Sequence, residues 1–458
     1  MRFADAISII IGVVVGTAIF KTPTLVFQNV NYEWQSYVLW LLGGLLSLCG
    51  ALCYAELSTS FSRNGGEYIF LSQAFGPWLG FLFGWAQLTA VHSGTVGTLA
   101  YAFSDYAMNV CVLPAWTNAW LAVGAIGVLT LVNLCGATTG RTVQNLLTAA
   151  KVLGLLILVG VGFATPLTET NIRATPSEFN PQFGLALVFV LYAYGGWNDT
   201  AYVAAEVKNR TRNLPRALFV GISGITVIYL LVNFACIRTL GFDAARLTYT
   251  PAADVVEKAF GAWGARATSL LVMISALGAI NAMIFTGSRV YCEMSRDYPL
   301  FKRIASPGDD KQIPPMALIA PGLFACILIL AVGTDRGQNV IDSAFSQVRL
   351  PVIPWEQYFG GFETLVAATA PVFWSFFLLS GVSLFLLRRV KSECEQAFRV
   401  PWYPLPPLLF CAMCGYMLYS SIAYAKWLSL LGFTPLVPGV VLYLLGRQAG
   451  STDPQITP

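Results

Sequence analysis

Two apolar stretches of the chain carry residues that interrupt a helix, and an interrupted helix releases backbone groups that can bind a ligand. The first stretch, Ile10–Pro23, holds Gly12 and Gly16 and closes on Pro23. Glycine costs about 1 kcal/mol relative to alanine inside a helix. Lipid offers no partner to freed N–H groups, so a break is tolerated only where it faces protein or a wet cavity. The stretch predicts either a site for an anion, such as a carboxylate, or close packing of a neighbouring helix on small residues.

The second stretch, Phe189–Thr200, has the same character. Gly195 and Gly196 lie near its middle and are followed by polar residues up to Asp199. Two interrupted helices at corresponding positions of two halves indicate an inverted repeat with a binding site between them. We infer the repeat from the breaks, and the pair favours the binding site over packing alone.

The two breaks together predict the chemistry of the ligand. N–H groups freed around Gly16–Ala18 favour negative charge. Carbonyl groups freed around Tyr192–Gly195 favour an ammonium group or another cation. A cavity with one pole for a carboxylate and one for an ammonium group fits an α-amino acid.

The composition places these stretches in a membrane. The chain has 458 residues, of which 56% are hydrophobic and only 11% are charged, whereas soluble proteins carry about 25% charged residues. Its apolar runs are long enough for spanning helices rather than barrel strands. The net charge of +4 indicates no nucleic-acid partner, because the basic residues lie between the apolar runs. The ten cysteines show no metal-ligand spacing, and we expect neither a metal nor a cofactor.

Hydropathy predicts an all-α membrane protein with about twelve transmembrane helices. The expected spans are Ala6–Phe27, Ser36–Leu57, Trp78–Val110, Ala119–Ala137, Gln144–Ala164, Phe183–Ala205, Ala217–Leu240, Thr268–Tyr291, Pro315–Val332, Leu365–Leu387, Pro404–Ser421 and Ala425–Leu445. The breaks fall in spans one and six. We therefore expect one domain over 1–458, with five-helix repeats at about 3–165 and 183–390 and two extra helices at about 403–446. The third span is long enough to be tilted.

The distribution of lysine and arginine predicts the orientation. With the N-terminus inside, seventeen basic residues fall on the inner side and nine on the outer side, with Lys151 inside a span. Short loops rich in basic residues stay on the cytoplasmic side. Both termini are therefore expected in the cytoplasm, and the protein in the plasma or inner membrane.

Several motifs resemble the amino acid–polyamine–organocation superfamily, and within it the L-type amino acid transporter family. Gly16–Phe20 resembles the family's carboxylate motif, although Ala18 replaces a glycine, and Ala193–Asn198 matches its sixth span. The other matching segments are Tyr54–Leu57, Asn64–Tyr68, Glu206–Asn209, Arg212–Pro215 and Asn281–Arg289. These motifs cover spans one to eight.

The resemblance implies a LeuT-type fold of five plus five helices and secondary transport of α-amino acids, above all the neutral ones, by alternating access. It implies sodium-independent exchange or facilitated transport, and no enzyme activity. The alternatives are an amine or polyamine carrier and a proton-coupled carrier of cationic amino acids with the same fold. By the resemblance, the substrate carboxylate would bind Val15, Gly16, Thr17 and Ala18, and its amino group Tyr192, Ala193, Tyr194 and Gly195.

Charged groups inside spans are costly and point to function. The resemblance places Lys151 where sodium-independent relatives carry a lysine in place of a metal ion, between spans one and eight. The alternative is a side chain that snorkels to the inner face. Asp199 could take part in proton coupling or make a structural hydrogen bond.

Four more polar residues have open or structural roles. We interpret Glu56 as structural at the inner gate, and His92, the single histidine, as a hydrogen-bonded core residue rather than a proton switch. Ser275 and Asn281 face either the ligand or span one.

The expected partners are a small amino acid and the lipid bilayer. Cys111 lies near the outer end of span three, in the region where animal relatives link to a heavy-chain glycoprotein subunit, but we expect no such link here. A receptor or a membrane enzyme is disfavoured because the sequence has no P-loop, nucleophile elbow or metal constellation.

Overall fold

Helices and short turns account for the residues that this computed structural model describes, and no strand occurs among them. These residues are 3–20, 22–61, 63, 65–111, 113–114, 116–165, 183–248, 251–298, 301, 314–355, 360–390 and 398–448. Helices suit a long apolar chain because they satisfy every backbone hydrogen bond within one segment.

The first half of the chain comprises α1 (Phe3–Val14), η1 (Ala18–Phe20), α2 (Thr22–Gln28), α3 (Glu33–Ser60), α4 (Glu67–Phe75), α5 (Pro77–Ala86), η2 (Gln87–Val91), α6 (His92–Cys111), α7 (Thr117–Leu134) and α8 (Ala137–Ala164). The second half comprises α9 (Phe183–Ala193), η3 (Trp197–Glu206), α10 (Arg210–Leu240), α11 (Phe242–Leu247), α12 (Pro251–Phe260), α13 (Ala262–Asp297), α15 (Pro315–Gly333), α16 (Asp335–Gln347), α17 (Gly360–Val390), α18 (Leu405–Ala425), η5 (Lys426–Leu428), α19 (Ser429–Phe433) and α20 (Leu436–Gln448). Elements η1, η3 and η5 are 3₁₀ helices, and η2 is a π-helical turn.

Eight helices of the described chain are long and apolar enough to cross a membrane. The expected spans one, three and six are absent from these eight because each is divided into shorter elements, and the last two spans are joined as Leu405–Leu445. The chain is therefore an integral, multi-pass membrane protein. The count of twelve spans and the five-plus-five repeat remain predictions.

Both interruptions that the glycines predict are present. Helix α1 ends at Val14, and a short turn leads into η1 at Ala18. Helix α9 ends at Ala193, and a turn leads into η3 at Trp197. The chain after the second break continues as ten residues of 3₁₀ helix rather than as α-helix, which the sequence pattern does not anticipate.

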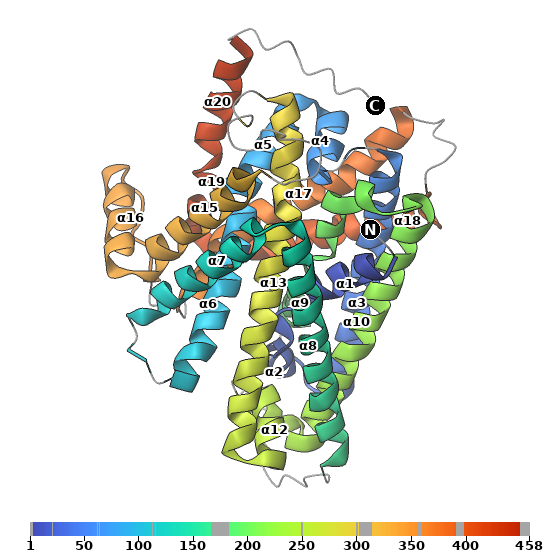
Figure 1. The fold of residues 1–458 in the computed structure, drawn as a ribbon, viewed down its shortest axis with the longest axis vertical. Helices are drawn as coiled ribbons and strands as arrows, with labels where there is room; N and C mark the ends of the chain where they lie inside the picture. The colour runs from blue at the N-terminus through green and yellow to red at the C-terminus, as the bar shows by residue number, and fades with distance from the viewer. Residues whose placement is uncertain are drawn as a thin grey trace.

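Long helices surround the interrupted ones. Figure 1 shows α8, α10 and α13 running side by side along the long axis, with the bent α12 near one end. Helix α1 contacts all three of these helices, and it also contacts η3. Helix α9 packs on α2 and α3. The two breaks therefore lie next to each other inside a cage of uninterrupted helices.

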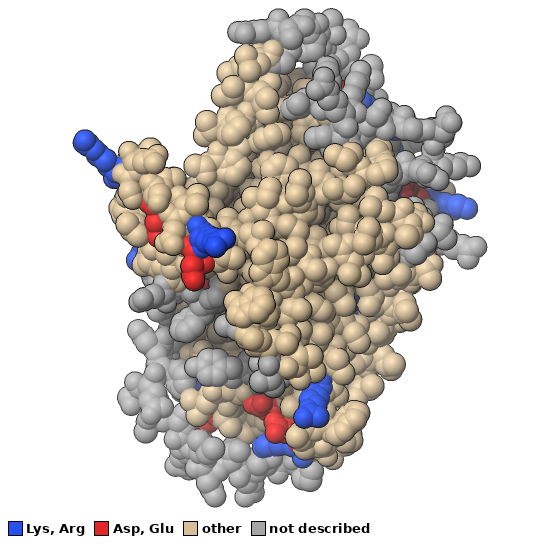
Figure 2. Space-filling model, turned by 60° about the vertical axis from the view of Figure 1, so that its left-hand side comes forward, with Lys and Arg blue, Asp and Glu red and all other residues tan. Residues whose placement is uncertain are grey.

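The outer surface is suited to lipid. Large apolar side chains such as Leu131, Leu146 and Phe219 are exposed on α7, α8 and α10. The face in Figure 2 has a broad area without charge, and its Lys, Arg, Asp and Glu side chains gather toward the margins of the view. Uncharged flanks and charged ends are the distribution that a bilayer requires.

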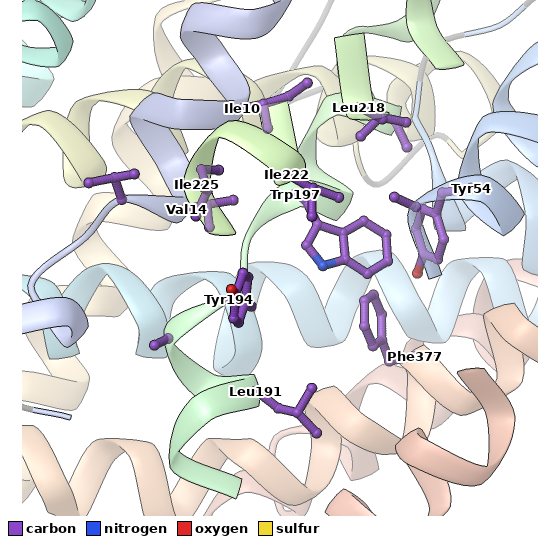
Figure 3. Close-up of a cluster of buried hydrophobic side chains, with 14 of the residues drawn as sticks. Ile10, Val14, Tyr54, Leu191, Tyr194, Trp197, Leu218, Ile222, Ile225 and Phe377 are labelled. Carbon is purple, nitrogen blue, oxygen red and sulfur yellow. The ribbon is translucent and has the colours of Figure 1, made fainter. Parts of the chain in front are cut away.

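Aromatic packing anchors the segment after the second break. The Trp197 ring packs against Tyr54 and Phe377, at centroid distances of 5.2 and 5.4 Å (Figure 3). Gly50 of α3 makes room for it, because a Cβ atom there would lie 2.7 Å from the indole ring. The contacts of Trp197 with α3 and α17 thus fix the start of η3. They also set the rotation of η3, and with it the directions of the side chains that follow.

Candidate functional site

A cavity of about 160 Å³ lies between the two helix breaks. Six of the eight substrate-binding residues expected from the sequence line it, namely Gly16, Thr17, Ala18, Tyr192, Ala193 and Gly195. Val15 and Tyr194 lie outside the wall. The Tyr194 hydroxyl instead donates to the Trp40 carbonyl oxygen at 3.0 Å, and its ring packs on Trp40 and Tyr229.

The first break leaves two donors free. The Gly16 N–H donates to Val14 O at 2.7 Å, and the Phe20 N–H donates to Thr17 O at 3.2 Å. The N–H groups of Thr17 and Ala18 have no backbone acceptor among the described residues. Ala18 does not adopt a positive φ, so the alanine that replaces a glycine of the resembled motif fits the turn without strain. Two adjacent free donors at the end of a helical segment are a match for a carboxylate.

The second break turns at Gly196, whose φ of 106° favours glycine. A Cβ atom there would also lie 2.7 Å from Cγ1 of Val13. The Gly195 N–H donates to Tyr192 O at 3.1 Å. A carbonyl oxygen that accepts one hydrogen bond retains a second lone pair, so the carbonyl groups around this break can still accept from an ammonium group.

Tyr229 of α10 links the two breaks. Its hydroxyl lies 3.0 Å from Ala193 O and 3.1 Å from Val14 O, and its side chain is fully buried. The sequence does not single out this residue, because a tyrosine in the middle of an apolar run gives no sign of which helix it faces.

Lys151 of α8 is fully buried and points at the first break. Its ammonium group donates to Gly12 O at 2.7 Å and to Val15 O at 2.8 Å. Gly12 belongs to the last turn of α1 and Val15 follows its end directly, where carbonyl groups lose their helical partners. The side chain does not reach the surface, so the snorkelling alternative does not describe this structure.

Ser275 and Asn281, both on α13, face different neighbours. The Ser275 hydroxyl lies 3.3 Å from Val15 O, beside the lysine. Asn281 instead joins a chain of amides, accepting from Asn133 at 2.8 Å and donating to Gln144 at 3.0 Å. Ser275 therefore supports the first break, whereas Asn281 ties α13 to α7 and α8 and does not line the cavity.

Asp199 lines the cavity and is almost fully buried. Its carboxyl group accepts from Asn198 Nδ2 at 3.3 Å and from the Thr286 hydroxyl at 3.4 Å. Asn198 Nδ2 also lies 3.2 Å from Oε1 of Glu67. Glu67 is the first residue of α4. The sequence does not mark it as a site residue, because it falls in a motif that is interpreted only as a loop.

The rest of the wall comes from helices whose register the sequence could not establish. The polar residues are Gln87 of η2, His92, Thr95 and Thr98 of α6, Tyr202 of η3 and Thr369 of α17. His92 donates from Nε2 to the Met283 carbonyl oxygen at 3.0 Å, as expected for a hydrogen-bonded core histidine. The π-helical turn η2 rotates this stretch, and such turns are frequent at functional sites.

Ion pairs close one end of the helix cage. Arg388 of α17 makes two bonds to Glu56 of α3, which also accepts from the Val400 N–H at 2.6 Å. Arg63 bonds to Glu293 at 3.1 Å and to Asp297 at 2.8 Å, both near the end of α13. Glu56 thus has the structural contacts that its position in the motif suggests.

A hydroxyl completes the second of these clusters. Tyr68 of α4 donates to Asp297, and burial together with the Asp297 carboxylate raises the pKa of Tyr68 well above its usual range. The phenol therefore stays neutral and acts as a donor. Among the described residues, no group of three or more His, Cys, Asp or Glu side chains could hold a metal ion.

Comparison with known proteins identifies the protein family that the chain resembles. The profile of the amino acid permease family matches residues 2–444. The chain is 28% identical to the b(0,+)-type amino acid transporter 1 of Mus musculus, over 96% of this chain and 86% of that protein. It is 25% identical to the Serine/threonine exchanger SteT of Bacillus subtilis (strain 168), over 91% and 90% of the two chains. It is 26% identical to the Large neutral amino acids transporter small subunit 2 of Homo sapiens, over 96% and 79%.

Proposed function

Because the chain belongs to the amino acid permease family, we propose that it carries neutral α-amino acids across the membrane by alternating access. Membership of this family makes it a transporter rather than an enzyme. The observation that carries the proposal is one cavity whose wall contains both helix breaks. A zwitterion requires donors and acceptors close together, and each break supplies one set.

The substrate carboxylate is assigned to the first break. The N–H groups of Thr17 and Ala18, which have no backbone acceptor among the described residues, are its proposed donors, and both residues line the cavity. Gly16 has no side chain, so its backbone forms this part of the cavity wall. The Val15 carbonyl oxygen stabilises the turn by accepting hydrogen bonds from Lys151 and Ser275. Backbone donors suit an anion that must be released, because they bind without a fixed positive charge.

The substrate amino group is assigned to the second break. Carbonyl oxygens of Tyr192, Ala193 and Gly195 are the acceptors, and Tyr194 supports them from outside the wall. The Tyr192 ring lies against Phe362 at a centroid distance of 6.5 Å. An aromatic pair at this position can close the cavity over a bound substrate.

Sodium independence follows from Lys151 in this proposal. Its ammonium group, which reaches from α8, supplies the positive charge between α1 and α13 that a bound cation would otherwise supply. The name of one relative, an exchanger, supports exchange as the mode of transport. The twelve-span, five-plus-five arrangement with cytoplasmic termini completes the proposal, and it explains why the two broken helices meet.

The test is counterflow in liposomes. Purified protein is reconstituted, the vesicles are loaded with unlabelled alanine or leucine, and uptake of the labelled amino acid is followed with and without sodium. With equal pH on both sides, we expect uptake that internal amino acid stimulates and that does not depend on sodium. The proposal fails if no member of a panel of neutral, cationic and amine substrates is taken up, and binding without flux would indicate a receptor.

An amine or polyamine carrier is the second candidate, favoured by the acidic Asp199 in the cavity wall. Such a substrate lacks the carboxylate that the first break would bind. Competition separates the two. Free amino acids should inhibit uptake of labelled alanine, whereas methyl esters and decarboxylated analogues should not. Inhibition by the decarboxylated analogues alone would favour the amine carrier.

A further inference from the structure

We propose that Asp199 and Glu67 form a proton-binding carboxyl pair beside the substrate cavity, through which the carrier couples amino acid movement to a proton. The inference rests on the proposed transport function and adds a second transported species. The first observation is that both carboxyl groups lie close to the same amide nitrogen. One amide nitrogen, Asn198 Nδ2, lies 3.2 Å from Glu67 Oε1 and 3.3 Å from Asp199 Oδ1. The two carboxyl groups are therefore neighbours.

Both carboxyl groups are buried without a compensating base. Glu67 is 2% exposed and Asp199 is 4% exposed. The nearby bases have other partners, because Arg289 bonds to Glu206 and Arg63 bonds to Glu293 and Asp297. Lys151 bonds to the carbonyl groups of α1. Within the described chain no salt bridge reaches either member of the pair.

The other titratable groups around the pair bring no positive charge. Tyr54 of α3 donates to Glu67 Oε1 at 3.1 Å, and Tyr202 of η3 accepts from Gln87 at 3.2 Å. His92 of α6 is occupied by the Met283 carbonyl oxygen, and Tyr291 of α13 lies within electrostatic range of Asp199. Two adjacent carboxyl groups in such surroundings cannot both ionise, so they share at least one proton.

The surroundings of the pair leave buried polar atoms without a close partner. Oε2 of Glu67 and the hydroxyl of Tyr291 are both buried, and neither makes a hydrogen bond of good geometry among the described residues, although the Tyr202 hydroxyl lies within electrostatic reach of Glu67. Buried polar atoms are almost always paired. A buried carboxyl oxygen in such a place costs less free energy in its neutral, protonated form than as an unpaired negative charge.

The position of the pair connects it to the substrate. Asp199 lies in the cavity wall, three residues after Gly196, on the segment that begins at the second break. A substrate that binds this break and a proton that binds Asp199 therefore act on the same element. In the proposed step, a proton from water on one side binds a carboxylate oxygen of Asp199, the cavity reopens on the other side, and the proton returns to water there.

The experiment uses the full chain in liposomes that contain a pH-sensitive dye. An inward proton gradient is imposed on vesicles without internal amino acid, and labelled alanine and internal pH are followed together. Wild-type protein should accumulate alanine above equilibrium, with acidification that depends on alanine. Glu67→Gln, which lies outside the cavity wall, should lose both responses while alanine counterflow persists. Glu257→Gln, an exposed acid on α12, is the matched control and should behave as wild type.

Asp199→Asn provides a second reading if Glu67→Gln does not fold. It should lose gradient-driven accumulation and flatten the pH profile of any counterflow that remains. Active wild-type counterflow without gradient-driven uptake or acidification would overturn the carboxyl pair and leave amino acid exchange standing. The inference is also wrong if both acid variants keep gradient-driven alanine uptake. It is equally wrong if the variants lose transport of lysine and arginine but not the proton-coupled uptake of alanine. Absence of all uptake would instead overturn the proposed function.

Discussion

Backbone conformation at single residues determines which groups the breaks offer. Gly16 has no positive φ, and a Cβ atom added there would meet its nearest neighbours at 3.9 to 4.0 Å. Gly196 has a φ of 106°, and a Cβ atom there would collide with Val13. The two glycines therefore differ. Gly16 lines the cavity and has room for a Cβ atom, whereas Gly196 is required by the fold of the break.

This difference predicts opposite outcomes for two alanine substitutions. Gly16→Ala should fold with an unchanged melting temperature but weaken alanine counterflow several-fold, because the methyl group enters the cavity wall. Gly196→Ala should lose about 1–2 kcal/mol from the left-handed backbone alone, and more from the contact with Val13. Thermal unfolding and the KM of counterflow are measured on both. A Gly16→Ala variant with normal KM, or a Gly196→Ala variant with normal stability, would contradict the assignment.

Lys151 is the other residue whose effect can be isolated. Removing its ammonium group with Lys151→Ala takes a donor from the carbonyl groups of Gly12 and Val15 and leaves Val15 O with only the Ser275 hydroxyl; a buried acceptor that loses its donor costs about 1–3 kcal/mol. We expect either loss of counterflow by about tenfold or more, or a new dependence on sodium as the ion replaces the ammonium group. Counterflow is compared with and without sodium, with the exposed Arg266→Ala as a control. Unaltered flux in Lys151→Ala would contradict the role.

At the scale of elements, the interrupted helices are held by their neighbours rather than by their own propensity. Tyr229 bridges the breaks from α10, and Lys151 and Ser275 bind the end of α1 from α8 and α13. Trp197 fixes η3 in an aromatic cluster with Tyr54 and Phe377 (Figure 3). An unwound segment in a membrane needs such contacts because lipid cannot replace its missing hydrogen bonds.

The close approach of α3 to Trp197 gives a prediction for this cluster. Gly50→Ala places a methyl group 2.7 Å from the indole ring and 2.8 Å from Phe410, and overpacking of this kind typically costs about 1–3 kcal/mol. The melting temperature in detergent should therefore fall. Gly127→Ala on α7, where nothing lies within 4 Å, is the matched control. Equal stability of the two variants would show that the cluster does not anchor η3.

At the scale of the whole molecule, charged side chains tie distant segments at one end of the cage. Arg63 joins the loop after α3 to the end of α13, and Arg388 joins α17 to α3. Elsewhere in the fold, Arg246 of α11 donates to Phe27 O and Val30 O. These two hydrogen bonds tie the end of α2 to α11. The alternating access proposed above would require contacts of this kind to open in turn, so under that proposal each cluster is expected to stabilise one state of the cycle.

A native cysteine can report on the first cluster. Cys292 is half-buried on α13, next to Glu293. Arg63→Gln removes the bonds to Glu293 and Asp297, and a loss of about 1.4 kcal/mol would raise the labelling rate of Cys292 by a maleimide roughly tenfold. Labelling is measured by mass spectrometry at each cysteine, with the exposed Arg336→Gln as control. An unchanged rate at Cys292 would mean that Arg63 does not hold this end closed.

The sequence by itself determined the membrane environment, the helical class and the positions of both breaks. Glycines in long apolar runs constrain the local backbone, and local constraints are visible in a sequence. Most of the expected backbone contacts, including Gly16, Thr17, Ala18, Tyr192 and Gly195, accordingly line the cavity.

Only the tertiary structure decided which side chains surround those breaks. Tyr229, Glu67 and Gln87 approach from helices far away in the chain, and Tyr194 and Asn281 turn away from the cavity. In a helix that is apolar on all sides, no hydrophobic periodicity shows which face meets a neighbour. Rotation of each helix is set by packing, so the carboxyl pair beside the cavity could be recognised only once the helices were in place.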